Sequence, residues 1–214
     1  HFYTEGTSAP AVLGGPLAAG LPAGTRALLT GTLGLVLEPM ATTLEALAVG
    51  LPDDVLLMVD PNARPSVIPD ADAWRERIVR VLPRADVVKA SAEDLEYLRP
   101  GEPIEGAAAW VAAHGPQVVL VTDGARPVTV LAGGAVHRVE SPPVEVVDTV
   151  GAGDTFGGAF LACFVHDGGT RADLADADRV LRAVRFAVRA SAAVCARPGA
   201  NPPTLADLGG WPAS

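Results

Sequence analysis

Residues 146–156 of the chain read Val-Val-Asp-Thr-Val-Gly-Ala-Gly-Asp-Thr-Phe. Before them, the alternation of residues 144–147 predicts the end of a β-strand, and after them the small apolar residues 155–165 predict a buried helix. Gly151-Ala152-Gly153 is therefore expected where a strand leads into a helix. Unpaired N–H groups and the helix dipole make such a position attractive to anions.

Asp154 is the unusual residue of this stretch, because it puts a carboxylate where an anion is expected to bind. A carboxylate there would crowd a bound phosphate unless it handles a proton. It suits a general base that takes a hydroxyl proton while neighbouring N–H groups hold a transferring phosphoryl group. A purely structural role is the alternative, with the glycines allowing tight strand–helix packing and Asp154 acting as a helix-start residue.

Two common nucleotide-binding motifs do not fit the chain. The third glycine, Gly157, comes one residue late for G-x-G-x-x-G, and no second strand ending in an acidic residue follows at the right distance. The sequence also contains no G-x-x-x-x-G-K-[ST] motif. This excludes a P-loop and disfavours a Rossmann-type dehydrogenase.

The complete string Asp-Thr-x-Gly-Ala-Gly-Asp-Thr-Phe resembles the C-terminal signature of the ribokinase-like (PfkB) carbohydrate kinases. The resemblance implies that Asp154 is the catalytic base and that Gly151, Ala152 and Gly153 form an anion hole. It also implies that Asp148, with nearby carbonyl groups, helps to hold a monovalent cation.

Composition narrows the classes of function that fit the chain. Its 214 residues are 49% hydrophobic, which predicts one large domain with a substantial core. A net charge of −9 argues against a general nucleic-acid or anionic-membrane binder. An acidic protein that binds ATP must rely on local N–H groups, magnesium and a few basic side chains.

Location is predicted from cysteine usage and from the absence of long apolar runs. Cys163 and Cys195 stand in apolar helical contexts, so we expect buried free thiols in a reducing compartment. No run approaches transmembrane length and no signal peptide heads the chain, which leads us to expect a cytoplasmic protein.

The order of elements predicts an α/β fold with a mainly parallel sheet. Residues 1–5 read as a strand and residues 11–24 as a loop with a short helix. Strands and helices then alternate from residue 26 to residue 122, followed by a hairpin through Gly133-Gly134 and two helices. Strands are expected at 26–30, 55–59, 86–89 and 117–122, and the last helix at 173–197.

Residues 60–65, Asp-Pro-Asn-Ala-Arg-Pro, form a polar loop after the apolar run 55–59. Open α/β sheets bind ligands at such strand ends, although turn formation alone would also explain these residues. The loop resembles the D-x-N-x-R segment of fructokinase-like sugar kinases. That resemblance implies that Asn62 and Arg64 lie near the sugar, with Arg64 close to the transferred phosphate.

Ser91 and Asp94 have the spacing of a helix capping box. The resembled family has an N-x-x-E motif at this point, linked to magnesium and phosphate positioning. In this chain Ser91 stands at the Asn position of the motif and Asp94 at the Glu position. We therefore expect only Asp94 to take part in magnesium positioning, and only indirectly.

Two further runs resemble the nucleotide-binding parts of the same family. Residues 122–124, Thr-Asp-Gly, resemble its T-x-G phosphate loop, although Arg126-Pro127 stands where the family has a later glycine. Residues 195–203 resemble its loop beside the adenine and the monovalent cation. The nucleotide-binding residues implied are Thr122, Gly124, Gly153, Ser191, Cys195 and Gly199.

The resemblance implies a ribokinase-like three-layer fold, with residues 1–214 forming a single domain equivalent to the C-terminal two-thirds of the family fold. The family's N-terminal part and its β lid have no counterpart here, so we expect a fragment, a processed product or part of a longer chain. The lid is also the region through which a homodimer is expected.

The implied activity is ATP-dependent phosphorylation of a primary hydroxyl on a small sugar, with Mg²⁺ and K⁺ as cofactors. Residues 60–65 favour fructose, while 2-keto-3-deoxygluconate and ribose remain alternatives. A different class also remains open, in which a remnant of the kinase fold binds a nucleotide or a sugar without turnover.

Overall fold

The computed structural model describes residues 21–212. The strand expected at residues 1–5, and most of the loop and helix expected at 11–24, lie outside this range.

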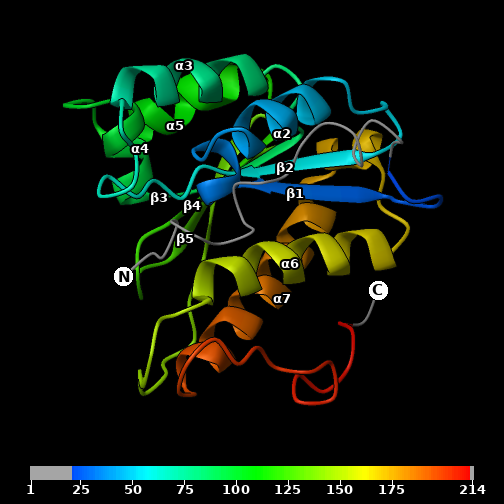
Figure 1. Ribbon diagram of the computed structural model, residues 1–214. Coiled ribbons are helices and arrows are strands. Elements are labelled where there is room, and N and C mark those ends of the chain that lie inside the picture. Colours follow the sequence, from blue (N-terminus) through cyan, green and yellow to red (C-terminus); the bar gives the residue numbers. More distant parts are fainter. Residues whose placement is uncertain (1–20, 213–214) are drawn as a thin grey trace.

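A sheet forms the centre of the molecule (Figure 1). It has six strands, which lie in sequence order. The strands are β1 (Ala27–Gly31), β2 (Leu56–Asp60), β3 (Val87–Ser91), β4 (Val118–Thr122), β5 (Val128–Ala132) and β6 (Ala135–Val139). Strands β1 to β4 are parallel, whereas β5 and β6 form the expected antiparallel hairpin. The predicted mainly parallel sheet is confirmed.

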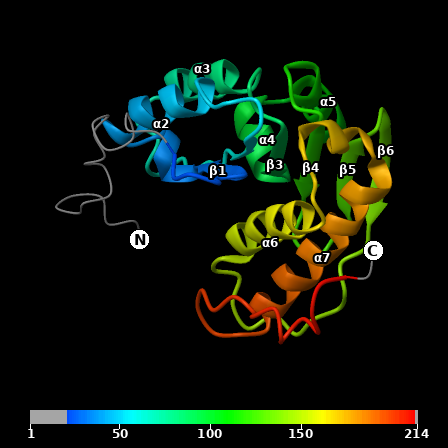
Figure 2. The same cartoon turned by 90° about the vertical axis from the view of Figure 1, so that its right-hand side faces the viewer.

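Helices cover both faces of this sheet and make the fold three-layered (Figure 2). One face packs against α2 (Met40–Val49), α3 (Ala71–Val81), α4 (Ala92–Leu98) and α5 (Ile104–Ala113). The other face packs against α6 (Ala152–His166) and α7 (Ala177–Cys195). Two short 3₁₀ helices, η2 (Thr32–Leu35) and η3 (Arg171–Ala175), precede α2 and α7. The predicted α/β architecture is confirmed.

The period of two along each strand decides which side chains reach which layer. On β2, Leu57 and Val59 join the core under α2 to α5, while Leu56 and Met58 join the core under α6 and α7. Because Asp60 follows Met58 by two residues, its side chain faces α6 as well.

Helix α6 lies close to the sheet because of Gly157. A Cβ atom at this position would lie 3.3 Å from Leu29 Cδ2 and 3.6 Å from Met58 Cε. The glycine one residue late for a dinucleotide motif therefore serves the packing of α6 on β1 and β2.

Two sequence expectations about elements are wrong. Residues 144–147 are in no strand, since Val146 and Val147 are 58% and 59% exposed and the Val147 N–H donates to the Cys195 carbonyl at 2.8 Å. The last long helix begins at Ala177 rather than at residue 173, because the Asp176 side chain accepts hydrogen bonds from the N–H groups of Asp178 and Arg179 and caps it.

Over residues 21–212, no helix has both the length and the apolar composition needed to cross a bilayer.

Candidate active site

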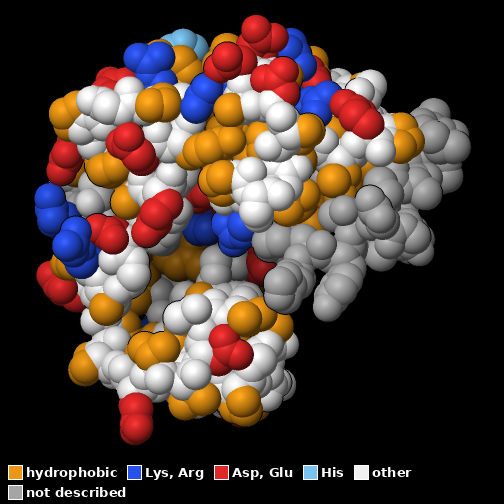
Figure 3. Space-filling model, turned by 60° about the vertical axis from the view of Figure 1, so that its left-hand side comes forward, with side chains coloured by type: hydrophobic (Ala, Val, Ile, Leu, Met, Phe, Trp, Pro, Cys, Tyr) orange, Lys and Arg blue, Asp and Glu red, His pale blue; other side chains and the backbone are white. Residues whose placement is uncertain are grey.

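The carboxyl ends of the parallel strands meet at one edge of the sheet. Register pairs Gly31 of β1 with Asp60 of β2, and Ser91 of β3 with Thr122 of β4. The view that turns this side of the molecule forward shows a hollowed surface with Lys or Arg side chains beside hydrophobic ones (Figure 3). Ligands of open α/β folds bind at this end of the sheet.

Helix α6 begins at this edge with a fixed backbone geometry. Gly151 is its N-cap and has a left-handed backbone, with φ of 79° and ψ of 3°, which favours glycine. The Ser191 hydroxyl of α7 donates a hydrogen bond to the Ala152 carbonyl over 3.1 Å. Because the first N–H groups of a helix have no acceptor within the helix, this anchored turn can hold an anion.

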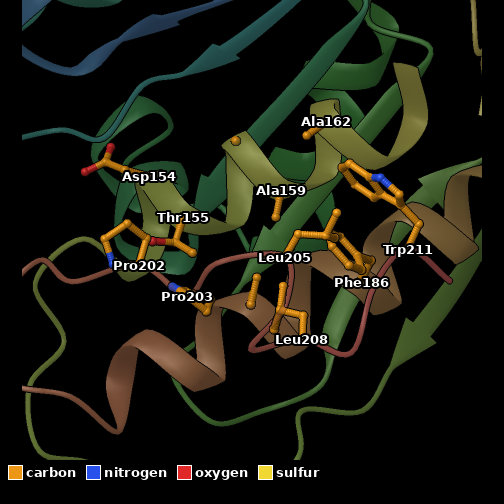
Figure 4. A pocket seen from close by; sticks show the side chains of 12 residues that line it. Asp154, Thr155, Ala159, Ala162, Phe186, Pro202, Pro203, Leu205, Leu208 and Trp211 are labelled. Atoms are coloured by element: carbon orange, nitrogen blue, oxygen red, sulfur yellow. The ribbon is translucent and has the colours of Figure 1, made fainter. Parts of the chain in front are cut away.

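Asp154 lies in the first turn of α6 and is exposed. It stands at one end of a pocket of about 420 Å³ between α6, α7 and the C-terminal segment, whose other end is at Trp211 (Figure 4). An exposed carboxylate beside the anchored helix start has the geometry of a proton acceptor next to an anion site.

A buried ion pair, which sequence reasoning missed, lies directly under this helix start. Lys89 Nζ is 2.9 Å from Asp60 Oδ2, and the two side chains are only 6% and 7% exposed. Burial raises the pKa of Asp60 above its ordinary value of 3.8, while Lys89 acts to lower it. The available signal was the chain's single lysine, which stands inside the otherwise apolar strand run 87–90.

Asp148 joins the loop before α6 to the loop after α7. Its Oδ1 accepts a hydrogen bond from the Val150 N–H at 3.0 Å, and its Oδ2 accepts one from the Gly199 N–H at 2.9 Å. These backbone N–H groups, Val150 first, hold the pKa of Asp148 below its ordinary value of 3.8. A carboxylate that stays ionised and keeps free lone pairs fits a cation ligand.

The structure therefore brings Asp148, Cys195 and Gly199 together, as the resemblance implies. The Asp148 N–H also donates to the Cys195 carbonyl at 3.2 Å. Thr122 ends β4 and Gly124 lies in the exposed turn that follows. That these residues bind a nucleotide stays a prediction.

The polar loop after β2 contacts the segment after β1, and each of the two contains a residue with an unusual backbone conformation. Asn62 and Thr32 have positive φ values of 39° and 48°, and they are the non-glycine residues within 21–212 that do so. The Asn62 side-chain amide donates to the Thr32 hydroxyl at 2.9 Å. Such conformations cluster at ligand sites, where the surrounding structure holds them in place. Arg64 is half-buried in the same loop.

Asp94 fixes this loop to the start of α4. Its Oδ1 accepts a hydrogen bond from the Ala63 N–H at 2.7 Å, and its Oδ2 accepts one from the Ser91 N–H at 2.8 Å. The Ser91 hydroxyl accepts in turn from the Asp94 N–H, so the predicted capping box is confirmed. The indirect magnesium role of Asp94 stays a prediction.

Both cysteines are free thiols, as expected. Cys163 is fully buried, and burial raises the pKa of its thiol to about 11. Cys195 is partly exposed, and burial followed by the charge of Asp148 raises its thiol pKa as well. Thiols with raised pKa values are poor nucleophiles, so neither marks a second reactive centre.

The comparison with protein families matches residues 40–207 to the pfkB family carbohydrate kinase model. A fructokinase from Rhizobium leguminosarum bv. trifolii is 36% identical over 167 residues, which cover 78% of this chain and 51% of that protein. A probable fructokinase-3 from Arabidopsis thaliana is 31% identical over 180 residues, covering 83% of this chain and 51% of that protein. The chain thus spans about half the length of these relatives.

Solved structures share the architecture. A fructokinase from Vibrio cholerae O395, crystallised with fructose, ADP and a calcium ion, matches with a TM-score of 0.75 and 26% identity, over 84% of this chain and 58% of that chain. A ribokinase from Thermotoga maritima shares the fold with a TM-score of 0.65 at 21% identity, over 86% of this chain and 55% of that chain.

The family match contains the start of α6, the loop after β2 and the loops joined by Asp148. It also covers more than half of the chain. The protein therefore belongs to the pfkB family of carbohydrate kinases.

Proposed function

We propose that the protein is an ATP-dependent sugar kinase that transfers the γ-phosphoryl group to a primary hydroxyl, with fructose as the preferred acceptor. The observation that supports this most directly is the exposed Asp154 carboxylate in the first turn of α6, beside the anchored Gly151–Gly153 backbone. The names of the relatives, which are fructokinases, support the choice of sugar.

In this proposal the first turn of α6 provides the proton acceptor and the N–H groups that stabilise the transferring phosphoryl group. Asp154 accepts the proton of the attacking hydroxyl, whose oxygen forms the new O–P bond while the bond from the γ-phosphorus to the β,γ-bridging oxygen breaks and ADP leaves. The N–H groups of Gly151, Ala152 and Gly153 hold the charge on the transferring group. Bound with ATP, magnesium would neutralise phosphate charge, and Asp94 would position it indirectly.

The acceptor and the nucleotide are assigned to different sets of residues. Asn62 and Arg64 bind the sugar, and Arg64 also offsets charge on the transferred phosphate. The nucleotide is bound by Thr122, Gly124, Gly153, Ser191, Cys195 and Gly199. Asp148 holds a monovalent cation, K⁺, and one Vibrio cholerae fructokinase structure is described as bound to a potassium ion.

Further expectations concern the whole protein. We propose that residues 1–214 form one domain, equivalent to the C-terminal two-thirds of the family fold. The protein works in the cytoplasm and binds no nucleic acid or membrane, in keeping with its net charge of −9. A homodimer would form through the lid region of the family.

The test measures ADP release with ATP, Mg²⁺ and K⁺ over a sugar panel of fructose, ribose and 2-keto-3-deoxygluconate. It uses the longest polypeptide that the gene encodes. Turnover with fructose should fall by about 100-fold or more in Asp154→Asn, with ATP binding retained, because the general base is removed.

Asp178→Asn is the matched control, because Asp178 is an exposed acidic residue in the first turn of α7. It should leave turnover unchanged. Equal loss of ATP binding and turnover in Asp154→Asn would reject the proposed role of Asp154. ATP binding without turnover on any sugar would favour the second candidate, a non-catalytic binding protein.

A further inference from the structure

The Lys89–Asp60 pair has no role in the proposed function described so far. Lys89 is 5% exposed on β3, where its alternation with Val87 directs it toward α6. Its ammonium is held by Asp60 of the neighbouring strand, 2.9 Å away. It is also the only lysine of the chain.

The ammonium lies against the first turn of α6. A Cβ atom on Gly153 would lie 2.9 Å from Lys89 Nζ and 4.0 Å from Asp60 Oδ2. A side chain at position 153 would therefore displace the Lys89 head group from its place beside Asp60. The residue next to Gly153 is Asp154, so the ion pair sits immediately under the proposed reacting carboxylate.

Packing alone does not account for this pair. Apolar side chains of similar size often replace a buried ion pair without loss of stability. Here the second carboxylate oxygen, Asp60 Oδ1, is buried and has no hydrogen-bond partner among the described residues. A buried oxygen without a hydrogen-bond partner lowers the stability of the fold. The pair therefore stabilises the fold less than a fully hydrogen-bonded ion pair would.

Negative charge accumulates at this edge of the sheet. Burial is the main cause that raises the pKa of Asp60, and Lys89 acts to lower it. The carboxylates of Asp94 and Asp154 lie close enough to raise that pKa further. Nucleoside triphosphates add several further negative charges. A positive charge fixed beneath the α6 start would offset part of this repulsion, in addition to the magnesium and Arg64 of the proposed function.

We propose that Lys89 is a positioning residue whose buried ammonium, held by Asp60 beneath Gly153, allows the α6 start to accept an anionic phosphoryl group. It acts through the first turn of α6 and through the field at Asp154, and needs no direct contact with the sugar. The inference rests on the proposed function for its ligand, a nucleoside triphosphate.

The first test compares Lys89→Met with the double variant Asp60→Asn/Lys89→Met. The single variant leaves Asp60 buried without its partner and is expected to unfold at a lower temperature. The double variant removes both charges and should fold. We expect its KM for ATP to rise by about tenfold and its kcat to fall by about 100-fold, as when one donor to a developing anion is lost.

A structural role predicts a different result, in which the folded double variant keeps both kcat and KM. That outcome would overturn the inference while leaving the kinase proposal intact. The matched control is Arg84→Met, which breaks the buried Arg84–Asp86 pair at the opposite end of β3, where the side chains are 11% and 0% exposed. It should lower stability and change neither kinetic constant.

The second test does not depend on turnover. Labelling lysine with ¹³C and ¹⁵N gives a side-chain NMR signal for Lys89, which is the only lysine of these 214 residues and whose signal is assigned by its loss in Asp60→Asn/Lys89→Met. Saturation with Mg²⁺ and the non-hydrolysable analogue AMP-PNP should shift that signal, and an Asp154→Asn change in the free protein should shift it too. A signal that responds to neither would contradict the inference, whereas shifts without turnover on any sugar would uphold it and reject the kinase.

Discussion

Two features of Gly151 disfavour any residue with a side chain: its left-handed backbone and the close approach of Ala200. Its φ of 79° is unfavourable for a residue with a Cβ atom, and such an atom would lie 3.3 Å from Ala200 Cβ. We expect Gly151→Ala to destabilise the fold by about 1–2 kcal/mol and to lower kcat, because the first turn of α6 would shift. Thermal unfolding and ADP release measure the two effects.

Gly158 provides the contrast for that experiment, since a Cβ atom there meets nothing within 4 Å. Gly158→Ala should raise the free energy of unfolding by up to about 1 kcal/mol, because alanine is the better helix former. Similar losses from both substitutions would show that the left-handed cap has no special importance.

Asp148 gives a prediction about pH. Its pKa is lowered in the folded state, so the stability that its ionised form contributes is present above pH 3.8 and is lost as the pH falls through the lowered pKa. The Tm of Asp148→Asn should therefore lie below that of the parent at pH 7. The difference should shrink below pH 3.8, and a difference that is constant with pH would contradict this assignment.

At the scale of elements, Asp94 connects α4 to the loop that follows β2. Asp94→Asn keeps one acceptor oxygen and loses the other, which leaves either the Ala63 or the Ser91 N–H unpaired. We expect a loss of about 1–3 kcal/mol in the free energy of unfolding and a higher KM for the sugar, since the loop bearing Asn62 and Arg64 would loosen.

The capping box formed by Thr170 and Asp173 at η3 is the matched control. It is more exposed than Asp94, and the neighbouring Arg171 pairs with Asp86 at the opposite end of β3. Asp173→Asn should lower stability slightly and leave the KM for the sugar unchanged. An equal KM effect from both substitutions would argue against the loop-holding role of Asp94.

Most elements were predictable because each had a local signature. The apolar run 55–59 gave β2, and the Ser91–Asp94 spacing gave the start of α4. The prediction of a strand at 144–147 was wrong because alternation of side chains does not show whether a backbone partner is present. No neighbouring strand pairs with this segment.

The candidate site was predictable only in part, for a related reason. Asp154 follows a recognisable glycine turn, so its importance can be read from local sequence. Lys89 matters through its approach to Asp60, which lies 29 residues earlier in the chain, and to Gly153 on α6. Contacts between separate strands and helices have no signature in either segment.

For the whole molecule, the net charge of −9 predicts how salt affects nucleotide binding. Repulsion between the protein and ATP should weaken as the Debye length falls to about 10 Å at 0.1 M salt. With potassium held constant, added tetramethylammonium chloride should therefore lower the KM for ATP. The KM for a neutral sugar is the internal control and should not change.

Asp148 also creates a thermodynamic linkage between the two ligands of the proposed kinase. Asp148 connects the loop before α6 to the loop after α7. A cation that orders one loop therefore also orders the other, and a nucleotide that binds there loses less conformational entropy. Reciprocity requires that potassium tighten ATP binding by the same factor by which ATP tightens potassium binding. In Asp148→Asn, both factors should fall together toward one.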